Sequence, residues 1–283
     1  MITANLKGGL GNQLFQYSAG RALSLRKNQP LNLDVSGYIK HSAIDTPRQC
    51  ELAPFNIQAN LPSLKEAEKL RNPYGIITKG LRFFKMKFLR KFNLHFYSGK
   101  GVYLDGFFQS EKYFIQYEKI IRQDLTLKNP LGPKAQEISN SIRNTPNSVS
   151  LHVRRGDYVQ DANTNRYWGT CSPEYYSKAL EYITSKIDQN IHVFVFSDDI
   201  QWVHENMPVA FPATYIDPAN MKDHESLILM SQCNHHIIAN SSFSWWGAWL
   251  NPKSDKIVVA PSVWTRKNRS LYKDIIPQTW IKI

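Results

Sequence analysis

The sequence is poor in cysteine and has no long apolar run. Three of its 283 residues are cysteine, and Cys50, Cys171 and Cys233 lack the paired spacing of a disulfide framework or a structural zinc site. No stretch is apolar for long enough to predict a membrane-spanning helix, and the chain enters its first predicted strand without the basic and apolar regions of a signal peptide. We therefore expect a cytoplasmic protein, whose 42% hydrophobic content is enough for a large buried core.

Acidic pairs with metal-chelating spacing are also missing. Asp198 and Asp199 follow a predicted strand at 192–196, but adjacent carboxylates on an extended chain point to opposite sides and rarely bind one ion. Because arginine can supply positive charge instead, we expect neither a metal nor any other cofactor. The two aspartates hold a ribose hydroxyl or brace Arg154 and Arg155, and capping of the next helix is the alternative for Asp199.

Acid is scarce in the chain as a whole. Lysine and arginine number 35 against 23 aspartate and glutamate residues, which gives a net charge of +12. Segment 79–92 is rich in basic residues and phenylalanine and contains no acid. On a helix it would form an apolar stripe with basic flanks, which either packs on its own domain or rests on anionic lipid head groups. The charge alone also fits a basic nucleic-acid-binding protein.

The most informative segment combines an apolar strand with charged residues directly after it. Residues 149–153 alternate as in a strand of a covered sheet, and Arg154, Arg155, Gly156 and Asp157 follow. Ligands of open α/β sheets bind beyond the carboxyl ends of strands, and a guanidinium pairs bidentately with phosphate and stays charged. The segment therefore predicts a diphosphate clamp. A surface turn with a solvent-screened Arg–Asp pair is the competing interpretation.

Two further segments predict ligand contacts at helix starts. Residues 8–13 (Gly-Gly-Leu-Gly-Asn-Gln) join a predicted strand, 2–6, to a predicted helix, 12–27. Their glycines let the backbone approach a ligand, although tight turns between strand and helix need glycine in any case. Residues 235–249 predict a buried strand, a serine-rich turn and a helix with tryptophans. The serines cap the helix and can hold a phosphate, whereas tryptophans more often pack in the core.

The remaining pattern alternates strands and helices, which predicts parallel βαβ units. Prolines and glycine at 129–133 predict a boundary between one domain at 1–130 and a second at 131–283. We expect strands at 2–6, 31–35, 102–104, 149–153, 192–196, 235–239 and 257–260, and helices at 12–27, 111–124, 173–187, 224–233 and 244–250.

Five motifs spread over nearly the whole chain form a set. They are Gly-Gly-Leu-Gly-Asn-Gln (8–13), Phe-Gln-Ser-Glu-Lys-Tyr-Phe (108–114), His-Val-Arg-Arg-Gly-Asp (152–157), Phe-Ser-Asp-Asp (196–199) and Ser-Ser-Phe-Ser-Trp-Trp (241–246). Together they resemble the bacterial α-1,2-fucosyltransferases of glycosyltransferase family 11. The His-x-Arg-Arg-x-Asp element is also similar to the donor motif of α-1,6-fucosyltransferases and protein O-fucosyltransferases, which use GDP-fucose and need no metal.

The resemblance implies an α/β fold of GT-B type, with two Rossmann-like domains facing a cleft. It implies an inverting transfer of L-fucose from GDP-β-L-fucose to the 2-hydroxyl of a terminal β-galactose, which forms an α-1,2 linkage in a bacterial surface glycan. The expected partners are GDP-fucose and a galactose-terminated oligosaccharide, but not nucleic acid. Through segment 79–92, we hypothesise, the enzyme also contacts the inner face of the membrane near lipid-linked acceptors.

The resemblance also assigns roles to residues. An arginine would hold the diphosphate, His152 would lie near guanine and Asn12 near the donor sugar. The residues expected to bind GDP-fucose are Gly11, Asn12, His152, Arg154, Arg155, Asp198, Ser241, Ser242, Phe243 and Ser244. We expect catalysis by Arg154, Arg155 and Asp157; Asp157 is the first candidate base and Asp161 the second. The first domain would bind the acceptor, and acceptor choice would depend on residues 38–100.

Three alternatives stay open. A transferase that uses another GDP-sugar is the nearest rival, and a nucleic-acid-binding protein is the rival outside enzymes. The tripeptide Arg155-Gly156-Asp157 is also one that adhesion receptors bind, but that role needs an exposed loop on a secreted protein.

Overall fold

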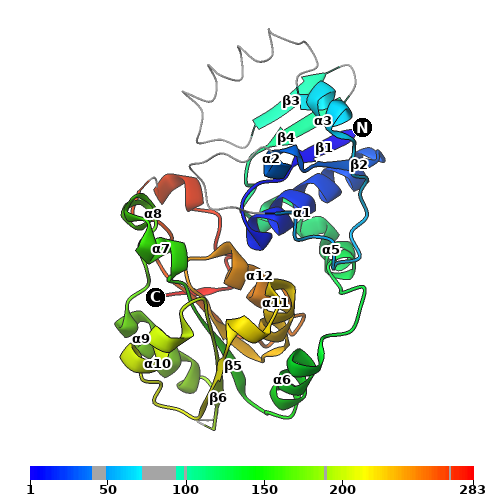
Figure 1. Ribbon diagram of the computed structural model, residues 1–283. Coiled ribbons are helices and arrows are strands. Elements are labelled where there is room, and N and C mark those ends of the chain that lie inside the picture. Colours follow the sequence, from blue (N-terminus) through cyan, green and yellow to red (C-terminus); the bar gives the residue numbers. More distant parts are fainter. Residues whose placement is uncertain (40–48, 72–93, 99–100, 188–189, 268) are drawn as a thin grey trace. The chain divides into compact units, whose positions relative to one another are not determined.

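The computed structural model describes residues 1–39, 49–71, 94–98, 101–187, 190–267 and 269–283. The chain divides into two compact units, Met1–Lys128 and Asn129–Ile283, and each contains its own sheet (Figure 1). The basic segment 79–92 lies outside the described residues, so its expected contact with lipid stays a prediction. Within the described ranges, no helix is long and apolar enough to cross a membrane.

Unit 1 is built on a four-stranded sheet of order β2-β1-β4-β3. Its central strand β1 pairs in parallel with β2 and β4, while β3 pairs antiparallel with β4. The strands are β1 (Ile2–Asn5), β2 (Leu31–Asp34), β3 (Leu94–Ser98) and β4 (Gly101–Asp105); the helices are α1 (Leu10–Lys27), α2 (Ser36–Ile39), α3 (Leu64–Arg71) and α5 (Glu118–Asp124). The predicted strand, glycine loop and helix at the start of the chain are confirmed as β1 and α1.

The predicted helix at 111–124 is wrong over its first half. Two 3₁₀ turns, η1 (Glu111–Tyr113) and η2 (Ile115–Tyr117), precede α5. Phe114 separates the turns with a backbone of φ −142° and ψ −1°, and its fully buried ring packs 6.2 Å from that of Phe15 on α1. Burial of this ring against α1 therefore accompanies a break in the helix that the sequence pattern did not predict.

Unit 2 contains a six-stranded, all-parallel sheet of order β10-β9-β8-β5-β6-β7. The strands are β5 (Ser148–Val153), β6 (His192–Ser197), β7 (Ala213–Ile216), β8 (His235–Ile237), β9 (Val258–Ala260) and β10 (Ile281–Lys282). The four strands predicted here are confirmed, with β8 shorter than expected. The edge strands β7 and β10 were missed, because β7 is half-exposed and lacks an apolar run and β10 has two residues.

Helices connect the strands of unit 2. They are α6 (Pro133–Arg143), α7 (Gly156–Gln160), α8 (Ala162–Tyr167), α9 (Pro173–Thr184), α10 (Ile200–Asn206), α11 (Asp223–Gln232) and α12 (Ser242–Leu250), with 3₁₀ turns η3 (Pro218–Asn220) and η4 (Arg269–Tyr272). Pro133, one of the predicted boundary residues, occupies the first turn of α6, where its missing N–H costs nothing.

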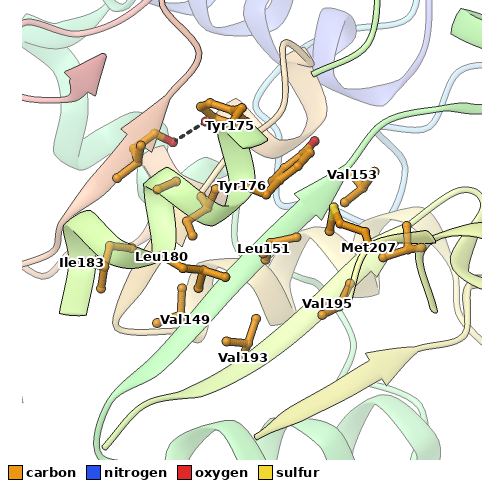
Figure 2. Packing of buried hydrophobic residues seen from close by; sticks show 14 of the residues in the cluster. Val149, Leu151, Val153, Tyr175, Tyr176, Leu180, Ile183, Val193, Val195 and Met207 are labelled. Atoms are coloured by element: carbon orange, nitrogen blue, oxygen red, sulfur yellow. Dashed lines mark hydrogen bonds between the residues drawn. The ribbon is translucent and has the colours of Figure 1, made fainter. Parts of the chain in front are cut away.

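The core of unit 2 lies between α9 and one face of the sheet. Figure 2 shows Val149, Leu151 and Val153 of β5 on the same side as Leu180 and Ile183 of α9. All five side chains are buried, and burial of such a side chain contributes about 1.5–3 kcal/mol. The strands end at the edge of this packed layer, so the residues that follow them start from fixed positions.

Candidate functional site

The carboxyl edge of the unit 2 sheet brings three of the sequence motifs together. Strands β8, β5 and β6 are neighbours and run parallel, so the segments that follow them leave the sheet at the same edge. Arg154 and Arg155 follow β5, Asp198 and Asp199 follow β6, and Ser241 precedes the helix that follows β8. This is the edge at which ligands bind in open α/β sheets.

Each arginine is held by an aspartate of its own. Arg154 Nη1 lies 2.8 Å from Asp198 Oδ2, with 22% and 26% of the two side chains exposed. Arg155 Nε lies 3.0 Å from Asp199 Oδ2, and the Arg155 backbone N–H donates to Asp198 Oδ1 at 2.8 Å. The aspartates thus brace the arginine pair, as one interpretation of the sequence predicted. Asp199 also caps α10 by accepting from Trp202 N at 3.4 Å. Bracing and capping by Asp199 are therefore both confirmed, and its contact with a ribose hydroxyl stays a prediction.

Trp202 fixes the plane of the second guanidinium. The Cζ atom of Arg155 lies 3.5 Å from the centroid of the Trp202 ring, which is the stacked geometry that arginine adopts on indole. In the described part of the chain, Arg155 Nε is bonded to Asp199, and the two Nη groups have no protein hydrogen-bond partner. They are available to an anion.

Gly156 lets the chain pass close to Asp198. A Cβ atom at this position would lie 2.4 Å from Asp198 Oδ2, a distance at which something has to move. Since that carboxylate is already fixed by Arg154 and by the Arg155 N–H, any larger residue would disturb the bracing of both arginines.

His152 lies on β5, two residues before Arg154, and is buried. Its side chain is 4% exposed, and burial, with a smaller effect from the nearby Arg154 charge, lowers its pKa to about 3. Its Nδ1 atom has no hydrogen-bond partner among the described residues. His152 is therefore neutral at pH 7, which fits hydrogen bonding to an uncharged group better than pairing with a phosphate.

The start of α12 lies beside His152. The rings of Phe243 and His152 are 5.8 Å apart, and Ser241 Oγ caps the helix by accepting from Phe243 N at 3.3 Å. The first turn contains no acidic residue, so the positive end of the helix dipole is not neutralised locally. Ser242 is half-buried, whereas Ser244 is 1% exposed and its hydroxyl donates to the Ser241 carbonyl.

The tryptophans that follow belong to the core, as predicted. Trp245, Trp246 and Trp249 are between 0% and 3% exposed. Trp245 Nε1 donates to the Ile275 carbonyl at 2.7 Å.

Asn240 ties the α12 start to the α7–α8 region. Its Nδ2 donates to the carbonyl oxygens of Gly169 at 3.0 Å and Trp264 at 3.2 Å. The backbone carbonyl of Asn240 accepts from the Tyr158 hydroxyl at 3.2 Å. The Tyr158 ring lies 5.5 Å from the Arg154 guanidinium carbon. The sequence interpretation missed the roles of Tyr158, Trp202 and Asn240. Of these three roles, only that of Trp202 had a signal in the sequence, because Trp202 lies three residues after Asp199 at the start of a helix.

The glycine loop is in unit 1, where Gly11 and Asn12 form part of the first turn of α1. One N–H group at the start of α1 is already occupied by an acid, because the Leu10 N–H donates to Glu51 Oε2 at 3.1 Å. Gln13 joins the same segments, since the Glu51 N–H donates to Gln13 Oε1 at 2.8 Å. Asn12 Oδ1 accepts from Gln109 Nε2 at 2.7 Å. The loop therefore offers an oriented amide rather than a vacant helix start.

The family model for glycosyl transferase family 11 matches residues 1–283. The chain belongs to glycosyltransferase family 11. This confirms the resemblance inferred from the five motifs. An α-1,2-colitosyltransferase of Escherichia coli is 36% identical over 295 residues, which span 100% of this chain and 99% of the relative. A galactoside α-(1,2)-fucosyltransferase 2 of Sus scrofa is 26% identical over 260 residues, 88% of this chain and 69% of the relative.

Solved structures of the fucosyltransferase NodZ share the fold of this family 11 chain. The enzyme from Bradyrhizobium has a TM-score of 0.51 at 12% identity, and NodZ α-1,6-fucosyltransferase co-crystallised with GDP has a TM-score of 0.54 at 13% identity. Both comparisons cover 88% of this chain and 92% of the other. The α/β, GT-B-like fold class predicted from the sequence is confirmed.

Two other interpretations of the arginine segment lose support in this family 11 protein. An adhesion tripeptide needs an exposed arginine, but the Arg155 side chain is 15% exposed and bound to Asp199. A loose surface turn does not fit two braced arginines at one sheet edge. The side chain of Asp157, the predicted base, lies outside what the structure describes; its backbone is in α7. Among the described residues, no cluster of histidine, cysteine or acid has metal-binding geometry.

Proposed function

We propose that the chain is an inverting fucosyltransferase that moves L-fucose from GDP-β-L-fucose to the 2-hydroxyl of a terminal β-galactose in a bacterial surface glycan. The observation that carries this proposal is the pair of arginines, each braced by its own aspartate, at the carboxyl edge of the unit 2 sheet. Family membership and the α-1,2-fucosyltransferase and α-1,2-colitosyltransferase relatives support it. Unit 2 would bind the donor and unit 1 the acceptor.

The chemistry needs positive charge where the leaving group forms. As the bond between fucose C1 and the β-phosphate oxygen breaks, the electron pair stays on GDP and the ring gains oxocarbenium character. Fixed guanidinium groups stabilise such charge without reorganisation, an effect worth several kcal/mol for a well-placed group. Arg155 suits this role because Trp202 and Asp199 hold it while its Nη groups stay available.

The start of α12 would complete the phosphate site. The first-turn N–H groups that Ser241 does not cap and the unneutralised dipole favour an anion, and Ser242 would add a hydroxyl donor. The hydroxyl of Ser244 bonds within the helix, so we assign to Ser244 only its backbone N–H. His152, neutral and buried, would bond to guanine or ribose.

The acceptor hydroxyl has to lose its proton as C1 is attacked from the face opposite GDP. Asp157 is our candidate base. Asp161 is a weaker one, because it caps α8 by accepting from the N–H groups of Asn163 and Thr164, which lower its pKa. A carboxylate stabilised in this way is a poorer proton acceptor.

A second donor is favoured by one comparison. The α-1,2-colitosyltransferase relative covers the whole chain, and colitose is L-fucose without its 3-hydroxyl. A site that bonds to the 3-hydroxyl would discriminate strongly against the deoxy sugar, whereas an apolar site would not. The ratio of kcat/KM for GDP-fucose and GDP-colitose decides between these donors.

The test combines a donor screen with arginine variants. Purified protein is incubated with GDP-fucose or GDP-colitose and lactose, N-acetyllactosamine or a galactosyl-β-1,3-N-acetylhexosamine, and the linkage is assigned by NMR. Arg154→Ala and Arg155→Ala should each lower kcat roughly a hundredfold or more. Arg143→Ala, on the exposed face of α6, is the matched control. Wild-type turnover in both arginine variants with the fold intact would refute the clamp.

Contact with the membrane is a separate proposal. We propose that segment 79–92 holds the enzyme near lipid-linked acceptors at the inner membrane face. Sedimentation with anionic and neutral liposomes at low salt tests it, and equal binding to both would remove it.

A further inference from the structure

The carboxyl edge of the unit 1 sheet carries polar and aromatic side chains that the donor chemistry does not use. Strands β1 and β4 are adjacent and parallel, so they end at the same edge. Asn5 ends β1 and Asp105 ends β4, and Lys7 and Phe107 lie two residues beyond those ends. Ligands of α/β sheets bind beyond such ends, so this edge is where a ligand of unit 1 is expected.

Among the described residues, two carboxylates and one ammonium lie at this edge, because Asp34 ends β2 beside Asn5 and accepts from the Tyr103 hydroxyl. Lys7 Nζ lies 3.1 Å from Asp105 Oδ1, and the two side chains are 39% and 10% exposed. Asn5 Nδ2 donates to the same carboxylate oxygen at 3.0 Å. Because the ammonium of Lys7 is already paired with a carboxylate and Asp34 adds a second acid, a phosphate or an acidic sugar gains little there. Hydroxyl groups, which both donate and accept, can bond to an ammonium, a carboxylate and an amide alike.

An aromatic ring stands next to the ion pair. Phe107 is 41% exposed, and Lys7 Nζ lies 4.9 Å from the centroid of its ring. Burial of an exposed aromatic ring by a ligand is favourable. A galactose ring presents hydroxyl groups at its rim and a patch of C–H groups on one face, which matches an exposed phenylalanine beside hydrogen-bonding groups.

The same segment aligns the amide of Asn12. Phe108 is 2% exposed and has a left-handed backbone with φ 51°, an uncommon conformation for a large residue. Burial of Phe108 leaves its neighbours Phe107 and Gln109 nearer the surface. Gln109 Nε2 then donates to Asn12 Oδ1 at 2.7 Å. One segment, 105–109, thus supplies a carboxylate, a ring and the partner of the Asn12 amide.

We propose that this edge, formed by Asn5, Lys7, Asp105 and Phe107, binds the neutral terminal galactose of the acceptor, next to the Asn12 amide that is expected at the donor sugar. The inference rests on the proposed function, since it names the acceptor site of the same reaction. The competing explanation is an ordinary surface ion pair beside an exposed apolar side chain, neither of which needs a ligand.

Phe107→Ala is the decisive variant. At saturating GDP-fucose it should raise the KM for lactose roughly tenfold, with kcat and the Kd for GDP close to the wild-type values. Phe107→Trp keeps a ring and should restore most of the affinity. Ile115→Ala is the matched control, because Ile115 is 42% exposed in a 3₁₀ turn of the same unit, and it should change neither constant.

Direct binding separates this inference from the proposed function. Saturation-transfer NMR in the presence of GDP should show lactose bound to the wild type and weakened in Phe107→Ala. Should that variant not fold, Asp105→Asn tests the same edge, with a raised KM for lactose expected. An unchanged KM in the folded variants, or a wild type that binds no galactoside, overturns the inference. Lactose binding without any transfer from GDP-fucose would instead refute the donor assignment and leave this site in place.

Discussion

A methyl group added at Gly156 should release the braced arginines. The new Cβ of Gly156→Ala would lie 2.4 Å from Asp198 Oδ2, and its backbone φ is not one that only glycine adopts. The carboxylate cannot turn away freely, because it accepts from the Arg155 N–H and pairs with Arg154, both at 2.8 Å. Loss of a hydrogen bond to a charged group costs about 1.5–3 kcal/mol, while the partly exposed ion pair adds at most about 1 kcal/mol.

We therefore expect Gly156→Ala to lower the free energy of unfolding of unit 2 by about 2 kcal/mol. Affinity for GDP should fall roughly tenfold, since Arg154 is no longer held in place. Denaturant unfolding and isothermal titration calorimetry measure the two effects. Gly37→Ala is the control, because a Cβ at Gly37 in α2 meets its nearest atom at an ordinary 3.7 Å, and it should be neutral or slightly stabilising.

A double-mutant cycle tests the cause of the effect. Asp198→Ala removes the atom that the new methyl group would strike, so Gly156→Ala should cost little stability in that background. If Gly156→Ala costs the same with and without the Asp198 carboxylate, the steric argument is refuted. The same conclusion follows if Gly156→Ala is as harmless as Gly37→Ala.

Two further predictions concern Trp202 and His152. Trp202→Ala removes the ring beneath Arg155 and should weaken GDP binding by about 1 kcal/mol, with Trp202→Phe intermediate; calorimetry that finds the two variants equal would refute the stacking role. The pKa of His152 is about 3 in the folded protein against 6.5 for an ordinary histidine. Below pH 6.5 the unfolded chain thus binds a proton that the folded chain does not, and stability falls as pH falls, by up to about 1.4 kcal/mol per pH unit. His152→Gln should flatten the dependence of unfolding free energy on pH between 6.5 and 5; an unchanged slope would contradict the buried neutral imidazole.

The sequence predicted the parts of the fold that have strong periodicity. Strand β5 alternates apolar with polar residues, strands β6 and β9 carry β-branched and apolar residues in a row, and α1 and α9 have clear helical spacing. These patterns were enough to identify the five elements. Tertiary packing decided the rest. The helix expected at 111–124 breaks where Phe114 is buried against Phe15 of α1. These residues are about a hundred positions apart, so no local sequence pattern could predict their contact.

The charged residues of the candidate site were predictable from the sequence, but the residues that orient them were not. A strand followed by Arg154 and Arg155 implied a cationic edge, and parallel pairing of β5 with β6 explains why Asp198 and Asp199 meet it. The partners that orient these groups were not visible in the sequence. Contact between Trp202 and Arg155 depends on how α10 starts, which is a property of the folded backbone.

The starts of α1 and α12 differ in a way that bears on where the donor phosphates bind. Each helix follows a strand that is parallel to both of its neighbours, and its N-terminus lies at the carboxyl edge of that sheet. At α1, the Leu10 N–H is bonded to the Glu51 carboxylate, whose negative charge opposes that of a phosphate. At α12, the cap is the neutral hydroxyl of Ser241, the first turn has no acid, and the neighbouring strand ends in two arginines. Electrostatics therefore favours a diphosphate at the start of α12 over one at the start of α1, in agreement with the proposed donor site in unit 2.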